Sequence, residues 1–399
     1  MHYSTDRILT THVGSLPRSN ELLRMLGEIE AGNELDRGEF RAEVLSGLQE
    51  IVRQQAASGI DIAGDGELPR IGFSFYAKDR MTGFGGQAQR GTVTDFAKFP
   101  DYAELVASRT ANATAAESAS VWATPECVDA VHYDDELTQA KEELDLFSQA
   151  LEAESEVSNG FAGTFVSAVT PGILATTLLR NEKNPAYATD EAYVFALAAE
   201  LKKEYDYIVS RGHILQLDAP DLALERQIMF VDQPLEVFQK RMEVHVEALN
   251  QALADVPKDN VRMHVCWGNW DGPHCDDVDL KDILSIIYQA NVGGLSLACG
   301  NPRHAHEIEE FRKLPLPEDM VMFPGVIDVT TNMLEHPQVV ANRLIEWVGV
   351  IGDRERVIAN TDCGFSTFAG YTMVAHDVVW AKMRAMADGA ALASQTLWN

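Results

Sequence analysis

The chain has 399 residues, of which 46% are hydrophobic, enough for one large α/β domain or two ordinary ones. Its 32 Lys and Arg residues against 61 Asp and Glu give a net charge of −29, which argues against nucleic acid and anionic membranes as partners, because both bind basic surfaces. No apolar run reaches the roughly 18–20 residues of a membrane span, and five cysteines are too few for a disulfide framework, so we expect a cytoplasmic protein.

Short apolar runs typical of β-strands recur along the chain, each followed by polar or glycine-rich residues and then by helical periodicity. The predicted strands are Ile8–Val13, Ile60–Gly64, Thr164–Thr170, Ile214–Asp218, Val261–Cys266, Gly294–Ala298, Met320–Val326 and Val357–Asn360. Amphipathic helices are predicted, for example, over Glu39–Ala57, Ala192–Ser210 and Pro337–Ile351. Eight strands alternating with helices predict a parallel sheet, and eight is the number that closes a (β/α)8 TIM barrel. A doubly wound open sheet is the alternative, although the first predicted strand lacks the glycine-rich phosphate turn usual in that fold.

The segment between the second and third predicted strands, about residues 72–163, is too long for one connection. It contains a glycine cluster (Gly83, Gly85 and Gly86) and an acidic, helix-favouring run over Asp134–Ser158. Long segments of this kind in compact domains are usually lids or binding loops. We therefore predict a single TIM-barrel domain over residues 1–399, with a large insertion after strand 2 that covers one face of the barrel.

A histidine and a cysteine end the fifth predicted strand, in Met263-His264-Val265-Cys266. Because side chains alternate along a strand, His264 and Cys266 lie on the same face. An imidazole beside a thiolate suits zinc, which favours nitrogen and sulfur ligands. Cys363 follows the last predicted strand and is the third candidate, since the carboxyl ends of all barrel strands meet at one mouth. The alternative is that both cysteines are small buried residues and His264 is a hydrogen-bonded core histidine.

Six motifs spread over almost the whole chain carry a resemblance to a known family. They are Thr11-His12-Val13-Gly14-Ser15-Leu16-Pro17-Arg18, Asp65-Gly66-Glu67, Leu215-Gln216-Leu217-Asp218, His264-x-Cys266, Asn301-Pro302-Arg303-His304 and Asp362-Cys363-Gly364. In this order they resemble the cobalamin-independent methionine synthase (methionine synthase II) family, in the short form with only the catalytic barrel. The resemblance implies a TIM barrel whose Zn²⁺, bound by His264, Cys266 and Cys363, activates a substrate thiol for alkylation. In the methionine synthases that thiol is homocysteine and the methyl donor is a methyl-tetrahydrofolate. A related branch, similar to epoxyalkane:coenzyme M transferase, uses the same ligand pattern to add a thiol to an epoxide.

The resemblance also implies where the thiol binds. In the family, a Gly-Ser pair after the first strand and acids after the second and fourth strands bind the amino-acid part of homocysteine. The matching residues are Gly14, Ser15, Glu67 and Asp218. Two carboxylates at one barrel mouth are costly unless a cation lies between them, and an ammonium group is such a cation. The alternative is that protein bases such as Arg18, Arg70 or Arg303 neutralise them.

Aromatic and histidine side chains are candidates for the pocket of the second substrate. We predict that His12 and Trp267 line it, with Trp270 and the Phe73–Tyr76 cluster, because an aromatic wall can stack on a pterin or cover an apolar electrophile. Ordinary packing is the alternative for each of them. His304 is predicted to act at the site through hydrogen bonds, as a catalytic group and not as a metal ligand, whereas His274 and Cys275 are read as loop residues.

Two departures from the family pattern bear on the reaction. Methionine synthases supply a glutamate ligand after strand six, where this chain has Ala298 followed by Cys299. Without the glutamate, a three-ligand zinc is less negative and its thiolate a weaker nucleophile, which suits a reactive electrophile such as an epoxide. A Cys299 ligand would instead close the coordination sphere, as in structural zinc sites. The second departure is Asp218-Ala219-Pro220-Asp221, where relatives carry a second acid directly after the first.

The sequence therefore predicts a zinc-dependent thiol alkyltransferase that transfers a methyl group to homocysteine or a similar thiol. Its predicted partners are a small-molecule thiol and an alkyl donor, with no nucleic acid and no membrane, and a homo-oligomer is left open. Three alternatives remain: thiol addition to an epoxide, a metal-free decarboxylase or lyase on the same barrel, and a non-catalytic barrel with structural zinc.

Overall fold

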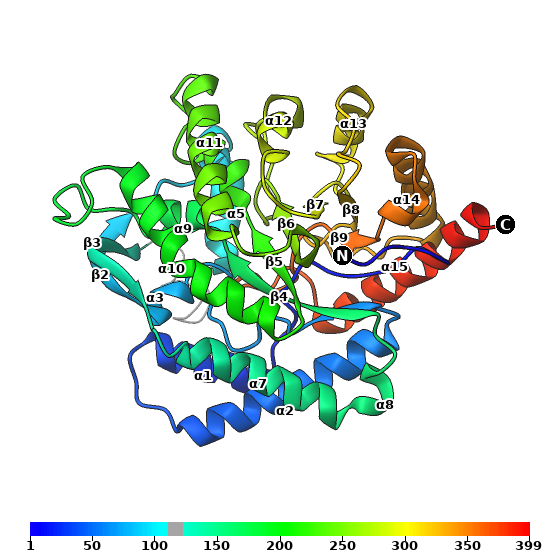
Figure 1. Cartoon of the computed structure of the whole chain (residues 1–399), viewed down its shortest axis with the longest axis horizontal. Coiled ribbons are helices and arrows are strands. Elements are labelled where there is room, and N and C mark those ends of the chain that lie inside the picture. Colours follow the sequence, from blue (N-terminus) through cyan, green and yellow to red (C-terminus); the bar gives the residue numbers. More distant parts are fainter. Residues whose placement is uncertain (111–122) are drawn as a thin grey trace.

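The computed structural model describes residues 1–110 and 123–399 and is built around seven parallel strands (Figure 1). The strands follow one another in chain order across a single curled sheet, and every neighbouring pair is parallel. They are β1 (Ile62–Gly64), β4 (Gly163–Val169), β5 (Ile214–Asp218), β6 (Val261–Val265), β7 (Gly294–Leu297), β8 (Val321–Ile327) and β9 (Asn360–Thr361). The predicted α/β class with parallel strands is confirmed.

A segment near the N-terminus links the two edges of this sheet. Thr10 forms a parallel bridge with Ala359, just before β9, and Thr11 forms one with Ile62 in β1. The predicted strand Ile8–Val13 is thus present as two isolated bridges and not as a regular strand. The reason lies in side chains that take over its backbone groups: Arg262 donates to the carbonyl oxygen of His12 at 2.8 Å, and the amide of Val13 donates to Oγ1 of Thr361 at 3.2 Å.

Helices cover the outside of the curled sheet, and side-chain caps fix where several of them begin. The longer ones are α1 (Asn20–Glu30), α2 (Arg37–Ala57), α10 (Asp190–Ser210), α11 (Leu235–Ala252), α14 (Pro337–Ile351) and α15 (His376–Leu397). Asp36 and Thr189 accept hydrogen bonds from the first-turn amides of α2 and α10, as N-cap residues do. Short helices α9 (Pro171–Thr177), α12 (Leu284–Ile287) and α13 (Glu310–Lys313) complete the connections after β4, β6 and β7.

Residues 72–163 contain a hairpin and several helices. Strands β2 (Met81–Gln89) and β3 (Ala123–Tyr133) pair antiparallel in a separate two-stranded sheet. The helices are α3 (Ala77–Arg80), α4 (Asp95–Lys98), α5 (Pro100–Thr110), α7 (Thr138–Ala153) and α8 (Ser155–Ser158). Helix α7 packs against α2 on the outside of the sheet (Figure 1). Residues 111–122 of the predicted insertion lie outside the described residues.

The inside of the curled sheet changes from apolar to polar along the strands. Toward their amino ends, a small apolar cluster contains Phe165, and the guanidinium of Arg262 lies 3.9 Å from the centre of that ring. Arg262 pairs in register with Gln216, and two residues further along the strands His264 pairs with Asp218. Because side chains repeat every second residue, these polar residues point to one face in successive layers. The carboxyl ends of β5 and β6 therefore carry the charged groups.

Two general expectations bear on the whole chain. All five cysteines are unpaired, so the prediction that no disulfide framework exists is confirmed. Among the helices of the described ranges, none combines the length and the hydropathy that a bilayer span requires.

Candidate metal centre

His264, Cys266 and Cys363 come together at the carboxyl ends of the strands. Their ligand atoms all lie within 4.8 Å of one another, and all three side chains are buried. His264 lies in β6 and Cys266 directly follows this strand, and both side chains point to the same face. Cys363 follows β9. The centre thus joins two strands that are far apart in the sequence.

Hydrogen bonds orient the imidazole of His264. Its Nδ1 lies 3.0 Å from Oγ of Ser296 on the neighbouring strand β7, and that hydroxyl also accepts a hydrogen bond from Nδ2 of Asn360 at 2.8 Å. When Nδ1 carries the proton and donates it to Ser296, the lone pair of Nε2 is free for a metal. Most metal-ligating histidines donate a hydrogen bond from their second ring nitrogen in this way.

The two sulfur atoms differ in acidity. A hydrogen bond from Cys363, helped by the charge of His264, lowers the pKa of Cys266 well below its usual value despite burial. The same interaction, together with burial, raises the pKa of Cys363 well above its usual value. Burial lowers the pKa of His264, but the Cys266 thiolate outweighs it and leaves that pKa raised. The lowered pKa favours the thiolate form of Cys266, and a bound cation would deprotonate the second thiol.

The spacing of the ligand atoms fits zinc. Sγ of Cys363 lies 3.6 Å from Nε2 of His264. Tetrahedral zinc with a Zn–S bond of about 2.3 Å and a Zn–N bond of about 2.0–2.1 Å places such a pair about 3.6 Å apart. Cys299 is not a member of this group among the described residues. Burial and the charges of Asp362 and Glu307 raise the pKa of its thiol well above its usual value.

Two buried carboxylates lie next to this centre. Asp218 stands beside His264 in the β5–β6 register, and burial together with the charge of Glu67 raises the pKa of Asp218 to about 8. Burial also raises the pKa of Glu67, whose Oε1 accepts a hydrogen bond from Ser167 at 2.8 Å while Oε2 is buried without a partner. Glu67 adopts a φ of 55°, a conformation rare for a residue with a side chain and one that clusters at functional sites.

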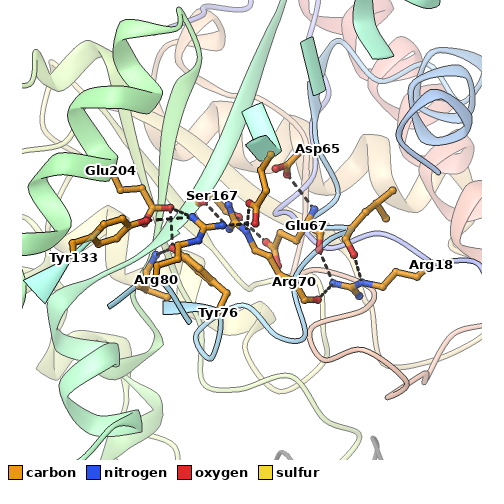
Figure 2. Close-up of polar contacts among 12 residues, drawn as sticks. Arg18, Asp65, Glu67, Arg70, Tyr76, Arg80, Tyr133, Ser167 and Glu204 are labelled. Atoms are coloured by element: carbon orange, nitrogen blue, oxygen red, sulfur yellow. Dashed lines mark hydrogen bonds and ion pairs between the residues drawn. The ribbon is translucent and has the colours of Figure 1, made fainter. Parts of the chain in front are cut away.

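Neither acid forms an ion pair with a protein base in the described part of the chain, although the charges of Arg70 and Arg18 lower the pKa of Glu67 against the effect of burial. Arg18 lies close to Glu67 but donates to carbonyl oxygens, including those of Leu68 at 3.0 Å and Ser366 at 2.9 Å. Arg70 forms its ion pair with Glu143, and Arg80 forms pairs with Glu143 and Glu204. Figure 2 shows these side chains as a row that runs from Glu204 through Arg80 and Arg70 toward Glu67 and Arg18. Glu67 and Asp218 have no ion pair among the described residues, and Arg303 is exposed.

Gly14 and Ser15 lie between Glu67 and the segment that carries Cys363. A Cβ on Gly14 would overlap Oε1 of Glu67. The carbonyl oxygen of Ser15 accepts a hydrogen bond from the amide of Phe365 at 2.8 Å, and a Cβ on Gly364 would overlap Oγ of Ser15. The structure thus gathers Gly14, Ser15 and Glu67 beside the candidate metal ligands.

The remaining predicted residues are packed against other side chains. His12 contacts Gln55 through Nε2 at 2.8 Å and packs its ring against Phe165, with ring centres 5.0 Å apart, and burial lowers its pKa to about 3. Trp267 is 1% exposed, and its indole Nε1 donates to the carbonyl oxygen of Val278 at 2.7 Å. Its ring stacks on that of His304, with centres 3.9 Å apart.

His304 belongs to a second group of metal-ligating side chains, with His274 and Asp277. Sequence reasoning missed this group because His274 and Asp277 follow β6, and His304 follows β7, in long loops without regular pattern. The available signal was a His-x-x-Asp pair, His274 and Asp277, after one strand and a histidine, His304, after the next.

The fold and the first group define an α/β protein with a candidate metal centre at the carboxyl ends of its parallel strands. Residues 165–390 match the family described as cobalamin-independent synthase, catalytic domain, and the chain belongs to this family. It is 25% identical over 356 residues to a methionine synthase of Thermococcus kodakarensis, covering 89% of this chain and 86% of that protein.

Two further relatives frame the comparison. A 2-hydroxypropyl-CoM lyase of Xanthobacter autotrophicus is 28% identical over 171 residues, covering 36% of this chain and 43% of that protein. The solved structure of a B12-independent methionine synthase from Shewanella sp. W3-18-1, in complex with selenomethionine, has a TM-score of 0.69 at 19% identity and covers 98% of this chain and 99% of that one. This structural similarity supports the fold. Membership of the family makes the chain a methionine synthase-like methyltransferase.

Proposed function

We propose that this protein is a zinc-dependent alkyltransferase that methylates the sulfur of homocysteine or a similar amino-acid thiol. One observation carries the proposal: three nitrogen and sulfur ligands stand beside two buried carboxylates, neither of which forms an ion pair with a protein base in the described ranges. Zn²⁺ bound by His264, Cys266 and Cys363 would deprotonate a coordinated substrate thiol at neutral pH. Three protein ligands leave a tetrahedral ion one open position, as in catalytic sites.

The chain's own residues position the substrate. Glu67 and Asp218 are buried with raised pKa values, and the charge of Glu67 contributes to that of Asp218, so a positive charge between them stabilises both carboxylates. The ammonium of an amino-acid thiol supplies this charge. Gly14 admits the Glu67 carboxylate at close range, and Ser15 fixes the neighbouring loop through Phe365. We propose His12, Trp267 and His304 as residues that shape the second-substrate side of the site, with His304 as the polar group there.

We also infer that the strands form a closed (β/α)8 barrel with the Thr10–Thr11 segment as its first strand. The bridges to Ala359 and Ile62 support this reading. In this closed barrel, residues 1–399 form one domain, and residues 72–163 are an insertion after the second strand. Five unpaired cysteines fit a reducing compartment, so we propose the cytoplasm.

Thiol addition to an epoxide is the second candidate. Two observations favour it: Ala298 stands where a carboxylate ligand is expected, and a 2-hydroxypropyl-CoM lyase is among the relatives. The unpaired carboxylates of Glu67 and Asp218 oppose it, because they would repel the sulfonate of coenzyme M.

X-ray absorption at the zinc edge tests the proposal. Protein purified without added metal should contain one zinc in a nitrogen and sulfur environment, and homocysteine should add one sulfur scatterer. Cys266→Ser should lose both the metal and the turnover, whereas Cys127→Ser, a buried cysteine outside the group, should retain both. Absence of zinc at the group would contradict the proposal, and a clear preference for coenzyme M would overturn the roles of Glu67 and Asp218.

A further inference from the structure

The second group of metal-ligating side chains has no metal-binding role in the proposed function, which uses only His304, as a polar group. Nδ1 of His274 lies 3.0 Å, and Nε2 of His304 lies 2.8 Å, from the same oxygen, Oδ2 of Asp277. The ligand atoms of all three residues lie within 4.8 Å of one another. All three residues are less than 10% exposed. Two imidazole nitrogens thus converge on a single carboxylate oxygen in a nearly buried place.

Two tryptophans enclose this group and link it to the zinc site. Trp267 directly follows Cys266 in the chain and stacks on His304, and Trp270 stacks on His274 with ring centres 3.9 Å apart. These stacked rings restrict how either imidazole can turn. The nitrogen atoms that face Asp277 are therefore held in place by packing, and the second group is an immediate neighbour of the first.

The atoms of His274 and Asp277 that point away from the centre are also fixed, whereas Nδ1 of His304 is buried without a hydrogen-bond partner among the described residues. Nε2 of His274 lies 3.1 Å from the carbonyl oxygen of Trp270 and donates to it, and Oδ1 of Asp277 accepts from Gln227 at 2.5 Å. Ligating histidines commonly donate their second N–H to a carbonyl in this way. With the proton on Nε2, the Nδ1 lone pair of a neutral His274 faces the Asp277 carboxylate. At 3.0 Å, this nitrogen lone pair and the carboxylate oxygen of Asp277 repel each other unless a cation lies between them. That cation is either a proton or a metal ion.

The separations match octahedral coordination. Ligands about 2.1 Å from an ion are about 3.0 Å apart at the edge of an octahedron and about 3.4 Å apart at the edge of a tetrahedron. The observed 2.8 and 3.0 Å agree with the octahedral edge, and they are also the usual length of an N–H···O hydrogen bond. Two histidines and one carboxylate are the protein ligands that first-row transition metals use when they keep open positions.

We propose that His274, Asp277 and His304 bind a second divalent ion of the first transition row, with water in the remaining positions. One further acid lies nearby and favours a cation: Asp95 accepts from the amide of His274 at 2.8 Å, whereas Asp276 forms an ion pair with Lys98. The donor set of nitrogen and oxygen differs from that of the His264 group, which contains two sulfurs. The two sites therefore give different spectra with the same metal.

Cobalt substitution tests this proposal. Chelator-treated protein is titrated with Co²⁺, and the bound metal is counted by equilibrium dialysis while the absorption spectrum is recorded. The wild type should bind two Co²⁺ per chain, one of which gives the strong ultraviolet charge-transfer band of thiolate ligands. His274→Ala should bind one Co²⁺ and retain that band. His306→Ala, which removes an exposed histidine from the loop that carries His304, should still bind two.

Each contrary result is decisive. A wild type that binds a single Co²⁺, or a His274→Ala protein that still binds two, would show that the group is a hydrogen-bonded cluster that shares protons only. Asp277→Asn retains most hydrogen-bonding capacity and serves where His274→Ala does not fold. Loss of one Co²⁺ in His274→Ala without any thiolate band in the wild type would support the second site while contradicting the proposed zinc centre.

Discussion

Gly14 leaves no room for even one additional carbon atom, because a Cβ there would overlap Oε1 of Glu67. Gly14→Ala should push the Glu67 carboxylate away from its position beside Ser167 without touching the metal ligands. We expect the Kd of homocysteine to rise at least about tenfold, the effect of losing about 1.4 kcal/mol of binding free energy. Calorimetric titration of the zinc-loaded protein measures this change.

The matched control is Gly349→Ala in α14, where a Cβ meets no atom within 4 Å. It should leave binding unchanged and add up to about 1 kcal/mol of stability, since alanine favours helices over glycine. Equal loss of binding in both variants, or zinc loss in Gly14→Ala, would contradict the role given to Glu67.

Ser296 is the only described hydrogen-bond partner of Nδ1 of His264. Ser296→Ala should let the imidazole turn and change tautomer, and we expect the affinity for Zn²⁺ to fall by roughly 10–100-fold, as for other partners of ligating histidines. Competition with a chromophoric chelator measures the affinity. Ser285→Ala, an exposed serine of α12, should bind zinc like the wild type. Unchanged affinity in Ser296→Ala would show that His264 is oriented by packing alone.

At the scale of elements, strands buried on both faces were the best predicted part of the fold. The predicted strand Ile214–Asp218 coincides with β5, and Val261–Cys266 extends one residue beyond β6. Both strands alternate apolar residues with polar ones, as in ILQLD and VRMHV, and this period of two is a local pattern. Ile8–Val13 failed as a strand because its backbone groups bond to Arg262 and Thr361, contacts between residues about 250 and 350 positions apart that no local pattern contains.

The candidate site shows the same difference between local patterns, which the sequence contains, and contacts between distant residues, which it does not. His264 and Cys266 lie on one face because side chains alternate along a strand, and this can be predicted from the sequence alone. The neighbourhood of His274 and His304 depends on β6 and β7 being adjacent and on how their loops fold back over each other. Stacking by Trp267 brings the loops together, and stacking leaves no periodic trace in a sequence.

Helix α4 fastens the loop after β6. Asp95 at its start accepts hydrogen bonds from the amides of His274 at 2.8 Å and Cys275 at 3.3 Å. Asp95→Ala leaves both amides without this partner, so we expect amide hydrogen exchange in residues 270–278 to accelerate at least about tenfold. Exchange monitored by mass spectrometry checks this prediction. Asp101→Ala, an exposed acid on α5, should leave that loop protected, and equal exchange in the two variants would show that α4 does not fasten it.

At the scale of the whole molecule, the side chains on the inside of the sheet form layers, from apolar at the amino ends of the strands to charged at the carboxyl ends. Apolar side chains such as Phe165 fill the amino-terminal end, Arg262 and Gln216 form a hydrogen-bonded layer above them, and Asp218 and His264 follow. Arg262 is buried, and burial lowers its pKa to about 9 although Asp218 raises it. This layer separates the apolar interior from the charged site, which is why two acids can be buried at one end of a well-packed sheet.

Buried histidines make the stability of the whole chain depend on pH. His213 lies between Phe147 and Thr164, and burial, with a contribution from Arg211, lowers its pKa to about 4. The unfolded chain, in which this pKa returns to about 6.5, binds more protons than the folded chain between these values. The contribution of His213 to stability is therefore full above about pH 6.5 and declines as the pH falls toward 4, by on the order of 3 kcal/mol.

His213→Gln tests this dependence because glutamine does not titrate and can still bond to Thr164. Between pH 7 and pH 4 its free energy of unfolding in urea should fall less than that of the wild type, by on the order of 3 kcal/mol. His376→Gln, an exposed histidine at the start of α15, should follow the wild-type curve. Parallel curves for His213→Gln and the wild type would mean that the imidazole of His213 is accessible to protons in the folded chain, contrary to its packing against Phe147.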